Sequence, residues 1–126
     1  MEDGRREIGK RGEDAAAHFI RKRGYKIVER NYTCTLGEMD IIALDGKTLC
    51  FIEVKALSGK TYGPPEIAVT VRKQRQLSKV ALTYLSQNNL HDTKARFDVV
   101  GVILSPDHEE VELIKDAFEL RYPDPP

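Results

Sequence analysis

The chain has 126 residues, of which 40% are hydrophobic and 32% are charged, and its formal net charge at pH 7 is zero. This composition is typical of a soluble globular protein, and no apolar run approaches the roughly 18 residues that a membrane span needs. We therefore expect residues 1–126 to form a single domain in the cytoplasm, without a membrane partner.

The first predicted element is a helix over residues 7–23. Apolar and small residues recur there at three- and four-residue spacing, and Gly24 is suited to end the helix. Glu13 lies at the flank of the apolar stripe, from which its carboxylate can reach the edge of a sheet. Residues 25–32 are predicted to form a first strand, followed by a loop over residues 33–37.

Two central strands are predicted next, over residues 38–44 and 48–55. Both are apolar on both faces, which is typical of strands covered by helices on each side. Asp45-Gly46 between them tolerates the positive φ of a tight hairpin turn. The hairpin should therefore form the middle of the sheet.

The remainder is predicted to contain one long helix and two more strands. The expected segments are a loop over residues 56–65, a helix from the cap Thr70 to Asn88-Asn89, strands over 96–104 and 111–115, and a final turn over 116–120. The order α-β-β-β-α-β-β, without a regular βαβ repeat, predicts an α/β sandwich with a mixed central sheet flanked by helices.

Acidic residues gather at one end of the predicted hairpin. Glu53 and Lys55 share a face because strand side chains alternate. A two-residue turn at Asp45-Gly46 makes Asp40 a diagonal neighbour of Glu53 on that face and places Glu38 directly across from Glu53. A three-residue turn would instead send Asp40 to the opposite face, so the hypothesis depends on the register.

Carboxylates crowded at a strand end repel one another unless a cation neutralises them. Oxygen ligands without His or Cys favour Mg²⁺ or Mn²⁺, which activate water and neutralise charge on a phosphodiester. Lys55 would then stabilise the attacking water or the phosphate electrostatically. The alternative is an ion pair of Glu53 and Lys55 that closes a strand, with Asp40 as a turn acid. Their joint occurrence across the hairpin favours the metal site.

Five stretches, in their order and spacing, make a specific pattern. They are Gly9-x-x-Gly-Glu13-x-x-Ala16, Gly37-Glu-Met-Asp-Ile-Ile42, Phe51-Ile-Glu-Val-Lys55, Tyr62-Gly63 with Lys73-Gln74, and Arg96-Phe-Asp-Val-Val100. The pattern resembles the YraN-like family of small bacterial proteins, which are similar to archaeal Holliday-junction resolvases and share the restriction-endonuclease-like fold.

This resemblance implies a catalytic site and a nucleic-acid contact surface. The implied catalytic residues are Asp40, Glu53, Lys55 and Glu13, with the three acids as metal ligands. The expected nucleic-acid contacts are Lys73, Gln74, Arg72 and Lys60. The implied activity is Mg²⁺-dependent hydrolysis of DNA phosphodiesters at branched or structured sites, and resolvases of this fold suggest a homodimer by analogy.

Two features keep other functions open. One is Leu57, which stands where the family commonly carries an Arg. The proline of the wider superfamily motif is also absent, with Met39 before Asp40, but its loss is frequent in this fold and does not disturb the ligands. The other feature is the distribution of charge. Residues 1–100 carry 18 Lys and Arg against 13 Asp and Glu, whereas residues 101–126 carry 2 against 7. The basic excess is modest, so a nucleic-acid-binding module without turnover is the main alternative. A protein-interaction domain that uses the acidic C-terminal segment ranks last.

Overall fold

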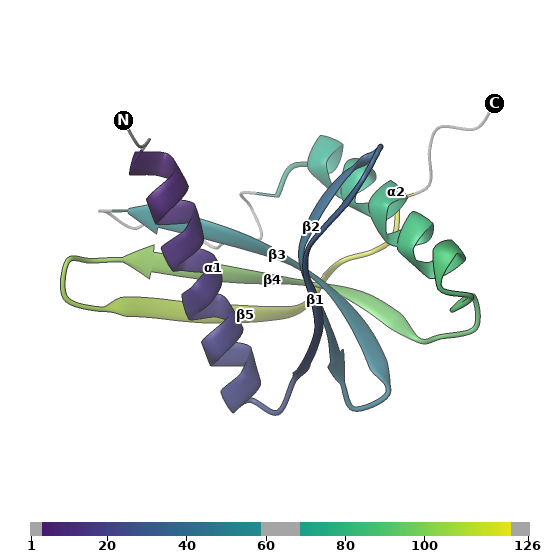
Figure 1. Ribbon diagram of the computed structural model, residues 1–126, viewed down its shortest axis with the longest axis horizontal. Helices are drawn as coiled ribbons and strands as arrows, with labels where there is room; N and C mark the ends of the chain where they lie inside the picture. Colours follow the sequence, from purple (N-terminus) through teal and green to yellow (C-terminus); the bar gives the residue numbers. More distant parts are fainter. Residues whose placement is uncertain (1–3, 59–68, 122–126) are drawn as a thin grey trace.

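The computed structural model describes residues 4–58 and 69–121, which form an α/β sandwich (Figure 1). In chain order the elements are α1 (Gly4–Lys22), β1 (Lys26–Cys34), β2 (Gly37–Asp45), β3 (Thr48–Ser58), α2 (Val71–Gln87), β4 (Ala95–Leu104) and β5 (Glu109–Phe118). The expected order α-β-β-β-α-β-β and the expected restriction-endonuclease-like class are confirmed.

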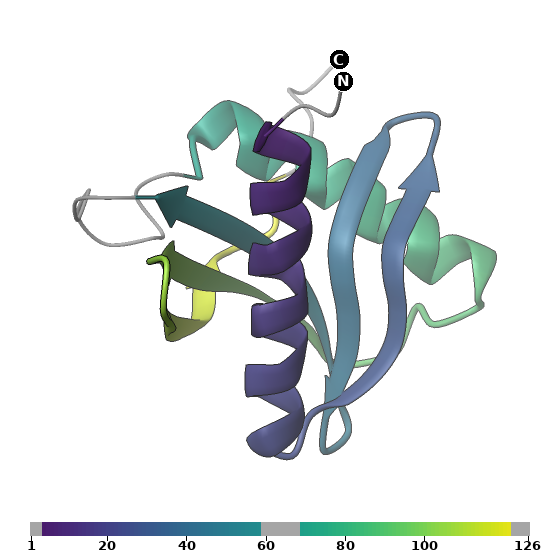
Figure 2. The ribbon, with the colours of Figure 1, turned by 60° about the vertical axis from the view of Figure 1, so that its left-hand side comes forward.

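The five strands form one mixed sheet in the order β1-β2-β3-β4-β5. β3 and β4 run parallel because α2 returns the chain between them, and the other neighbours are antiparallel. α1 packs on one face, against a core that includes Ile41, Ile52 and Val100. α2 covers the other face, whose core includes Phe51 and Val99 (Figure 2).

Local sequence explains where α2 begins and where α1 ends. Thr70 caps α2 as expected, since its side-chain oxygen accepts a hydrogen bond from the Lys73 N–H at 3.2 Å. α1 ends at Lys22, and Gly24 follows with φ +91°, a conformation that favours glycine. Within the described residues, neither helix combines the length and apolar character needed to cross a bilayer.

The β2–β3 hairpin has the expected parity but a register shifted by two residues. Asp45 pairs with Thr48, so the turn lies at Gly46 and Lys47 and not at Asp45-Gly46. Gly46 takes the positive φ of +63°, while Asp45 stays in the strand, where it accepts a hydrogen bond from Arg96. An even shift keeps every side chain on its predicted face.

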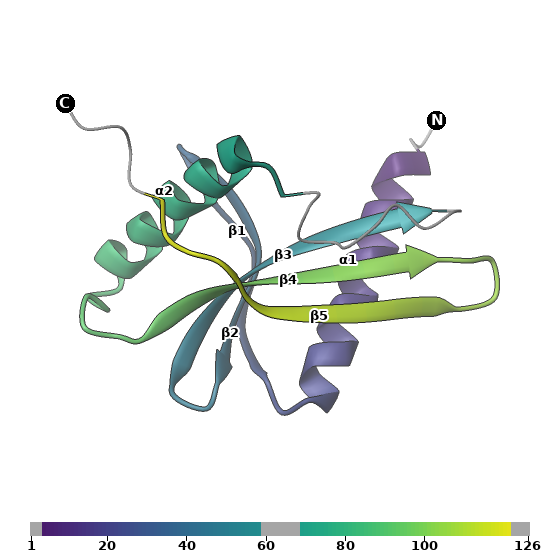
Figure 3. The same ribbon diagram turned by 180° about the vertical axis from the view of Figure 1, so that it is seen from behind.

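β5 is longer than the expected strand over 111–115, and no separate turn over 116–120 follows it (Figure 3). Its pairing with β4 shifts between Phe97 and Val99, where β5 carries extra residues. Asp116 adopts φ +52° at this bulge, and its N–H donates to the buried Asp98 carboxylate at 2.9 Å. At the bulge, the Asp116 N–H therefore bonds to a side chain and not to the backbone of β4, and the strand continues beyond it to Phe118.

Candidate active site

The candidate site lies where β2 separates from β3. The ladder between the two strands ends at the pair Ile41 and Ile52. One residue further, the Asp40 carboxylate accepts a hydrogen bond from the Val54 N–H at 2.8 Å, which satisfies a donor that β2 no longer reaches. Continuation of the register brings Asp40 directly opposite Glu53. The two acids therefore share a face and lie closer than the diagonal pair predicted.

Glu53 is a buried acid with two cations beside it. Its side chain is 6% exposed, and its Oε2 lies 3.9 Å from Lys55 Nζ and 3.7 Å from Lys73 Nζ. These separations are longer than the roughly 2.7–2.9 Å of a tight charge-assisted hydrogen bond. The ammonium groups therefore stabilise the Glu53 charge without engaging it closely.

The neighbouring Asp40 carboxyl is held partly protonated at neutral pH. Burial, followed by the hydrogen bond and the negative charge of Glu53, raises the pKa of Asp40 to about 8, and the Val54 N–H and Lys73 act in the opposite direction. Two carboxyl groups that share one proton are what results when like charges meet at a buried site. A divalent cation could take the place of that proton.

The donor chemistry of this pair fits a hard cation. Asp40 and Glu53 offer carboxylate oxygens, and Mg²⁺ often uses one or two protein carboxylates and keeps several waters. No group of three or more His, Cys, Asp and Glu side chains capable of holding a metal occurs among residues 4–58 and 69–121. Within the described residues, the candidate metal centre therefore has only two carboxylate ligands from the protein, Asp40 and Glu53.

The two other acids expected near the site have different partners. Glu13 on α1 is 14% exposed, and its Oε1 accepts hydrogen bonds from Arg30 Nε at 3.1 Å and Asn31 Nδ2 at 3.0 Å. Glu38 is exposed and pairs with Thr33 of β1. It does not lie across from Glu53 as expected, because the register is shifted and β2 has already left β3.

Of the four residues expected to contact nucleic acid, Lys73 at the start of α2 lies in the candidate site itself. Lys73 reaches Glu53, whereas the Gln74 side chain donates to the Val69 carbonyl at 3.0 Å and accepts from Arg121 at 2.6 Å. Arg72 is exposed beside them. Lys60 lies outside the described residues, as does the side chain of Leu57.

A close contact between α1 and β3 fixes the strand next to Lys55. A Cβ built on Gly12 would come within 2.5 Å of the Ala56 Cβ, so only glycine allows the helix to approach this closely. Gly12 itself is buried. Because Ala56 follows Lys55 directly, this contact positions the end of β3 that carries the site.

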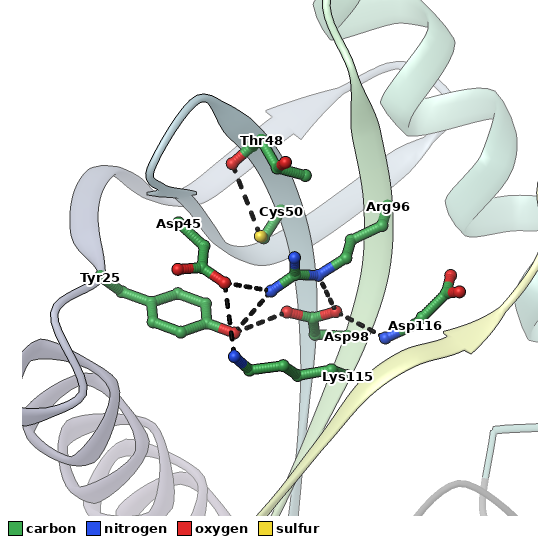
Figure 4. Close-up of polar contacts among 8 residues, drawn as sticks. All are labelled: Tyr25, Asp45, Thr48, Cys50, Arg96, Asp98, Lys115 and Asp116. Atoms are coloured by element: carbon green, nitrogen blue, oxygen red, sulfur yellow. Dashed lines mark hydrogen bonds and ion pairs between the residues drawn. The ribbon is translucent and has the colours of Figure 1, made fainter.

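A second polar cluster, not foreseen from the sequence, lies away from the site near the β2–β3 turn (Figure 4). Asp98 is fully buried and accepts hydrogen bonds from Tyr25 at 3.1 Å, Arg96 at 2.9 Å and the Asp116 N–H. Arg96 also donates to Asp45 at 2.7 Å and to the Tyr25 hydroxyl at 2.8 Å. We call these residues the Asp98 network, and Lys115 completes it through Asp45 at 3.4 Å.

The charges of the Asp98 network are matched. Burial, followed by the charge of Asp98, raises the pKa of the Tyr25 hydroxyl, so it stays protonated and donates. The hydrogen bond from Arg96 lowers the pKa of Asp45. One signal in the sequence could have revealed the network: Arg96 and Asp98 alternate onto one face of an apolar strand, and buried charges require partners.

The comparisons agree with the pattern of motifs. The model of the uncharacterised protein family UPF0102 matches residues 12–102. This range contains the candidate site and all of the Asp98 network except Lys115 and Asp116. A UPF0102 protein of Geobacter sulfurreducens is 51% identical over 116 residues, covering 91% of each chain. A UPF0102 protein of Geotalea uraniireducens is 53% identical over 119 residues, covering 93% of each chain. This chain therefore belongs to the UPF0102 family, the YraN-like family that its motifs resemble.

Proposed function

We propose that this protein is a metal-dependent nuclease that hydrolyses DNA phosphodiesters. The observation that carries the proposal is the meeting of Asp40 and Glu53 at the separation of β2 and β3, with Lys55 and Lys73 beside them. A buried and a half-buried carboxylate next to two lysines could supply metal ligands and phosphate contacts from one site, which supports the proposal. The resemblance to resolvases favours branched or structured DNA as the substrate.

The residues would divide the work by chemistry. Asp40 and Glu53 would hold Mg²⁺ or Mn²⁺, which when bound supplies a more acidic water and neutralises charge on the phosphate. Lys55 would stabilise the developing charge on the phosphoryl oxygens from beside Glu53. Lys73 would give up its loose contact with Glu53 to a phosphate oxygen, since its side chain is 36% exposed and can reach outward.

The charge of α2 supports a polyanionic substrate. The helix contains Arg72, Lys73, Arg75 and Lys79 and no acidic residue. The acidic segment of β5, with Glu109, Glu110 and Glu112, lies at the opposite edge of the sheet from β1. The basic residues of α2 can therefore contact a DNA backbone, and the acidic segment of β5 is separated from β3 by one strand, with Gly101 of β4 between Lys55 and Glu112.

Cleavage assays test the proposal. The purified protein should cut at least one of branched, single-stranded and duplex DNA in Mg²⁺ or Mn²⁺, and Glu53→Gln should abolish cutting. Asp92→Asn is the matched control, because it neutralises an exposed acid in the turn after α2 and should cut normally. Survival of every substrate under every metal condition would overturn the nuclease proposal.

A DNA-binding module without turnover is the second candidate. The observation that favours it concerns Glu13, which was expected to be a third metal ligand. Its carboxylate instead accepts hydrogen bonds from Arg30 and Asn31. This candidate predicts salt-sensitive DNA binding with no cutting, and Glu53→Gln should leave binding equal or tighter because a repelling charge is removed. Absence of DNA binding at low salt would end both candidates.

A further inference from the structure

A groove beside the candidate site has no role in the chemistry described above. It runs between α2 and the turn that joins β1 to β2, and its volume is about 380 Å³. We call it the Leu36 groove. Its lining residues are Leu36, Lys79, Leu82, Thr83, Ser86 and Gln87.

The turn is held firmly against the helix. The Gln76 side chain donates to the Leu36 carbonyl at 3.3 Å. Gly37 adopts φ +146°, and a Cβ there would lie 2.9 Å from the Gln76 amide nitrogen, so no larger residue fits without a shift. Leu36 is nevertheless 48% exposed, although it sits on this clamped turn. The structure therefore presents a large exposed apolar side chain on a turn that contacts α2.

The groove continues the basic surface of α2. Its α2 residues recur at the spacing of one helix face, and Arg72 and Gln76 lie on the same face nearer the site. Lys79 is six residues beyond Lys73, or about 9 Å along the helix axis, which is roughly three nucleotide rises of a stacked strand. No acidic residue lines the groove as the structure describes it. A strand that leaves the site along α2 would pass over it.

We propose that the Leu36 groove holds an unpaired nucleotide of the DNA that the active site cuts; this inference rests on the proposed function. The Lys79 ammonium takes the phosphate, and Leu36 and Leu82 contact the face of the base. Proteins hold single-stranded DNA with side chains that contact the base faces next to cations that bind the backbone; here Leu36 and Leu82 would supply an aliphatic surface where an aromatic ring is usual. A paired base is stacked inside the duplex and cannot enter the groove.

This assignment names a class of substrate: DNA with single-stranded nucleotides next to the cut. Contacts to the base face tolerate every base, so the groove selects strand state and not sequence. The clamp by Gln76 reduces the ordering cost of binding, because the turn is already in place before DNA arrives.

Fluorescence anisotropy in EDTA, where nothing is cut, tests the proposal. The probes are a short duplex with a single-stranded extension and the same duplex with blunt ends. Leu36→Ser should weaken binding of the extended duplex about 3- to 10-fold and leave the blunt duplex unchanged. The matched control is Val28→Ser, since Val28 is also a 46% exposed apolar residue, on the edge strand β1, and should bind both DNAs normally.

A second pair of variants tests the phosphate contact. Lys79→Gln should weaken binding of the extended duplex and lower its salt dependence, whereas Lys47→Gln, at the exposed β2–β3 turn, should not. Equal losses on both DNAs, or equal effects of Leu36→Ser and Val28→Ser, would overturn the groove assignment while the nuclease proposal stands. Failure of the wild-type protein to bind either DNA in EDTA would also overturn the groove assignment, whereas the nuclease proposal is decided by the cleavage assays in Mg²⁺ or Mn²⁺.

Discussion

Glu53 and Asp98 are both buried acids, but their surroundings differ. Asp98 accepts three hydrogen bonds, and the neighbouring Arg96 is shared with a second carboxylate, Asp45. Glu53 has two lysines at longer range and a second acid, Asp40, on its own face. The Asp98 network is satisfied within the chain, whereas the Asp40 and Glu53 pair gains from an added cation. On the proposed function, we therefore expect the first region to contribute stability and the second to contribute chemistry.

The largest expected effect of a single substitution is on activity, in Glu53→Gln. Cutting should fall on the order of 1000-fold, because a metal ligand and its charge are lost together. The free energy of unfolding should change by less than about 1 kcal/mol, since the change also removes repulsion with Asp40. Cleavage rates and urea denaturation of the same preparation measure both. A large loss of stability would place Glu53 with the structural acids.

Asp98→Asn should show the reverse pattern. The change removes the charged acceptor of three hydrogen bonds at a fully buried position, while Arg96 keeps its contact with Asp45, so the free energy of unfolding should fall by about 2–3 kcal/mol. The protein that remains folded at low temperature should bind metal as the wild type does, because the network lies away from the site. Urea denaturation checks the first statement. An unchanged stability would show that the network is not what holds this end of the sheet.

Gly12→Ala should produce a smaller effect that reaches the site through packing. The new Cβ would press on Ala56, at 2.5 Å, and moving α1 away should cost about 1–3 kcal/mol and slow cutting. Gly9→Ala is the control on the same helix. Nothing lies within 4 Å of a Cβ at Gly9, so this variant should be more stable by up to about 1 kcal/mol. Equal effects of the two variants would argue against the close contact.

The smallest effect concerns the pH dependence of stability. The pKa of Asp40 is raised from 3.8 to about 8 on folding, so between these values the native state binds more protons than the unfolded state. Stability should therefore fall as pH rises from about 4 to 8 and level off above that range. Asp40→Asn should remove this contribution, which we expect to be on the order of 1 kcal/mol after solvent screening. Denaturation midpoints across this range provide the check, and an unchanged slope in the variant would contradict the assignment.

The sequence was most informative where the two-residue alternation of strand side chains determines which face each residue occupies. Strand alternation placed Asp40 with Glu53 and Lys55, and it survived the two-residue error in register because both turns have the same parity. The predicted position of Glu38 across from Glu53 was wrong because of the same error in register. Parity fixes the face of a side chain, but only the exact register fixes which residue lies opposite.

Features formed by distant segments were not predictable in this way. The Asp98 network joins Tyr25 between α1 and β1, the end of β2, β4 and the β5 bulge, and no local pattern connects them. The bulge of β5 belongs to the same set of contacts, because the Asp116 N–H donates to Asp98. The approach of Gly12 to Ala56 likewise requires knowledge of which helix covers which strand.

Titration of Mn²⁺ into the protein by calorimetry tests the central claim most directly, because it asks whether Asp40 and Glu53 together hold a cation. The wild-type protein should bind with a saturable isotherm, and Asp40→Asn should lose that binding. Glu38→Gln, which changes an exposed acid of the same strand, should retain it. Equal binding by the wild type and Asp40→Asn, or no binding by either, would contradict the account.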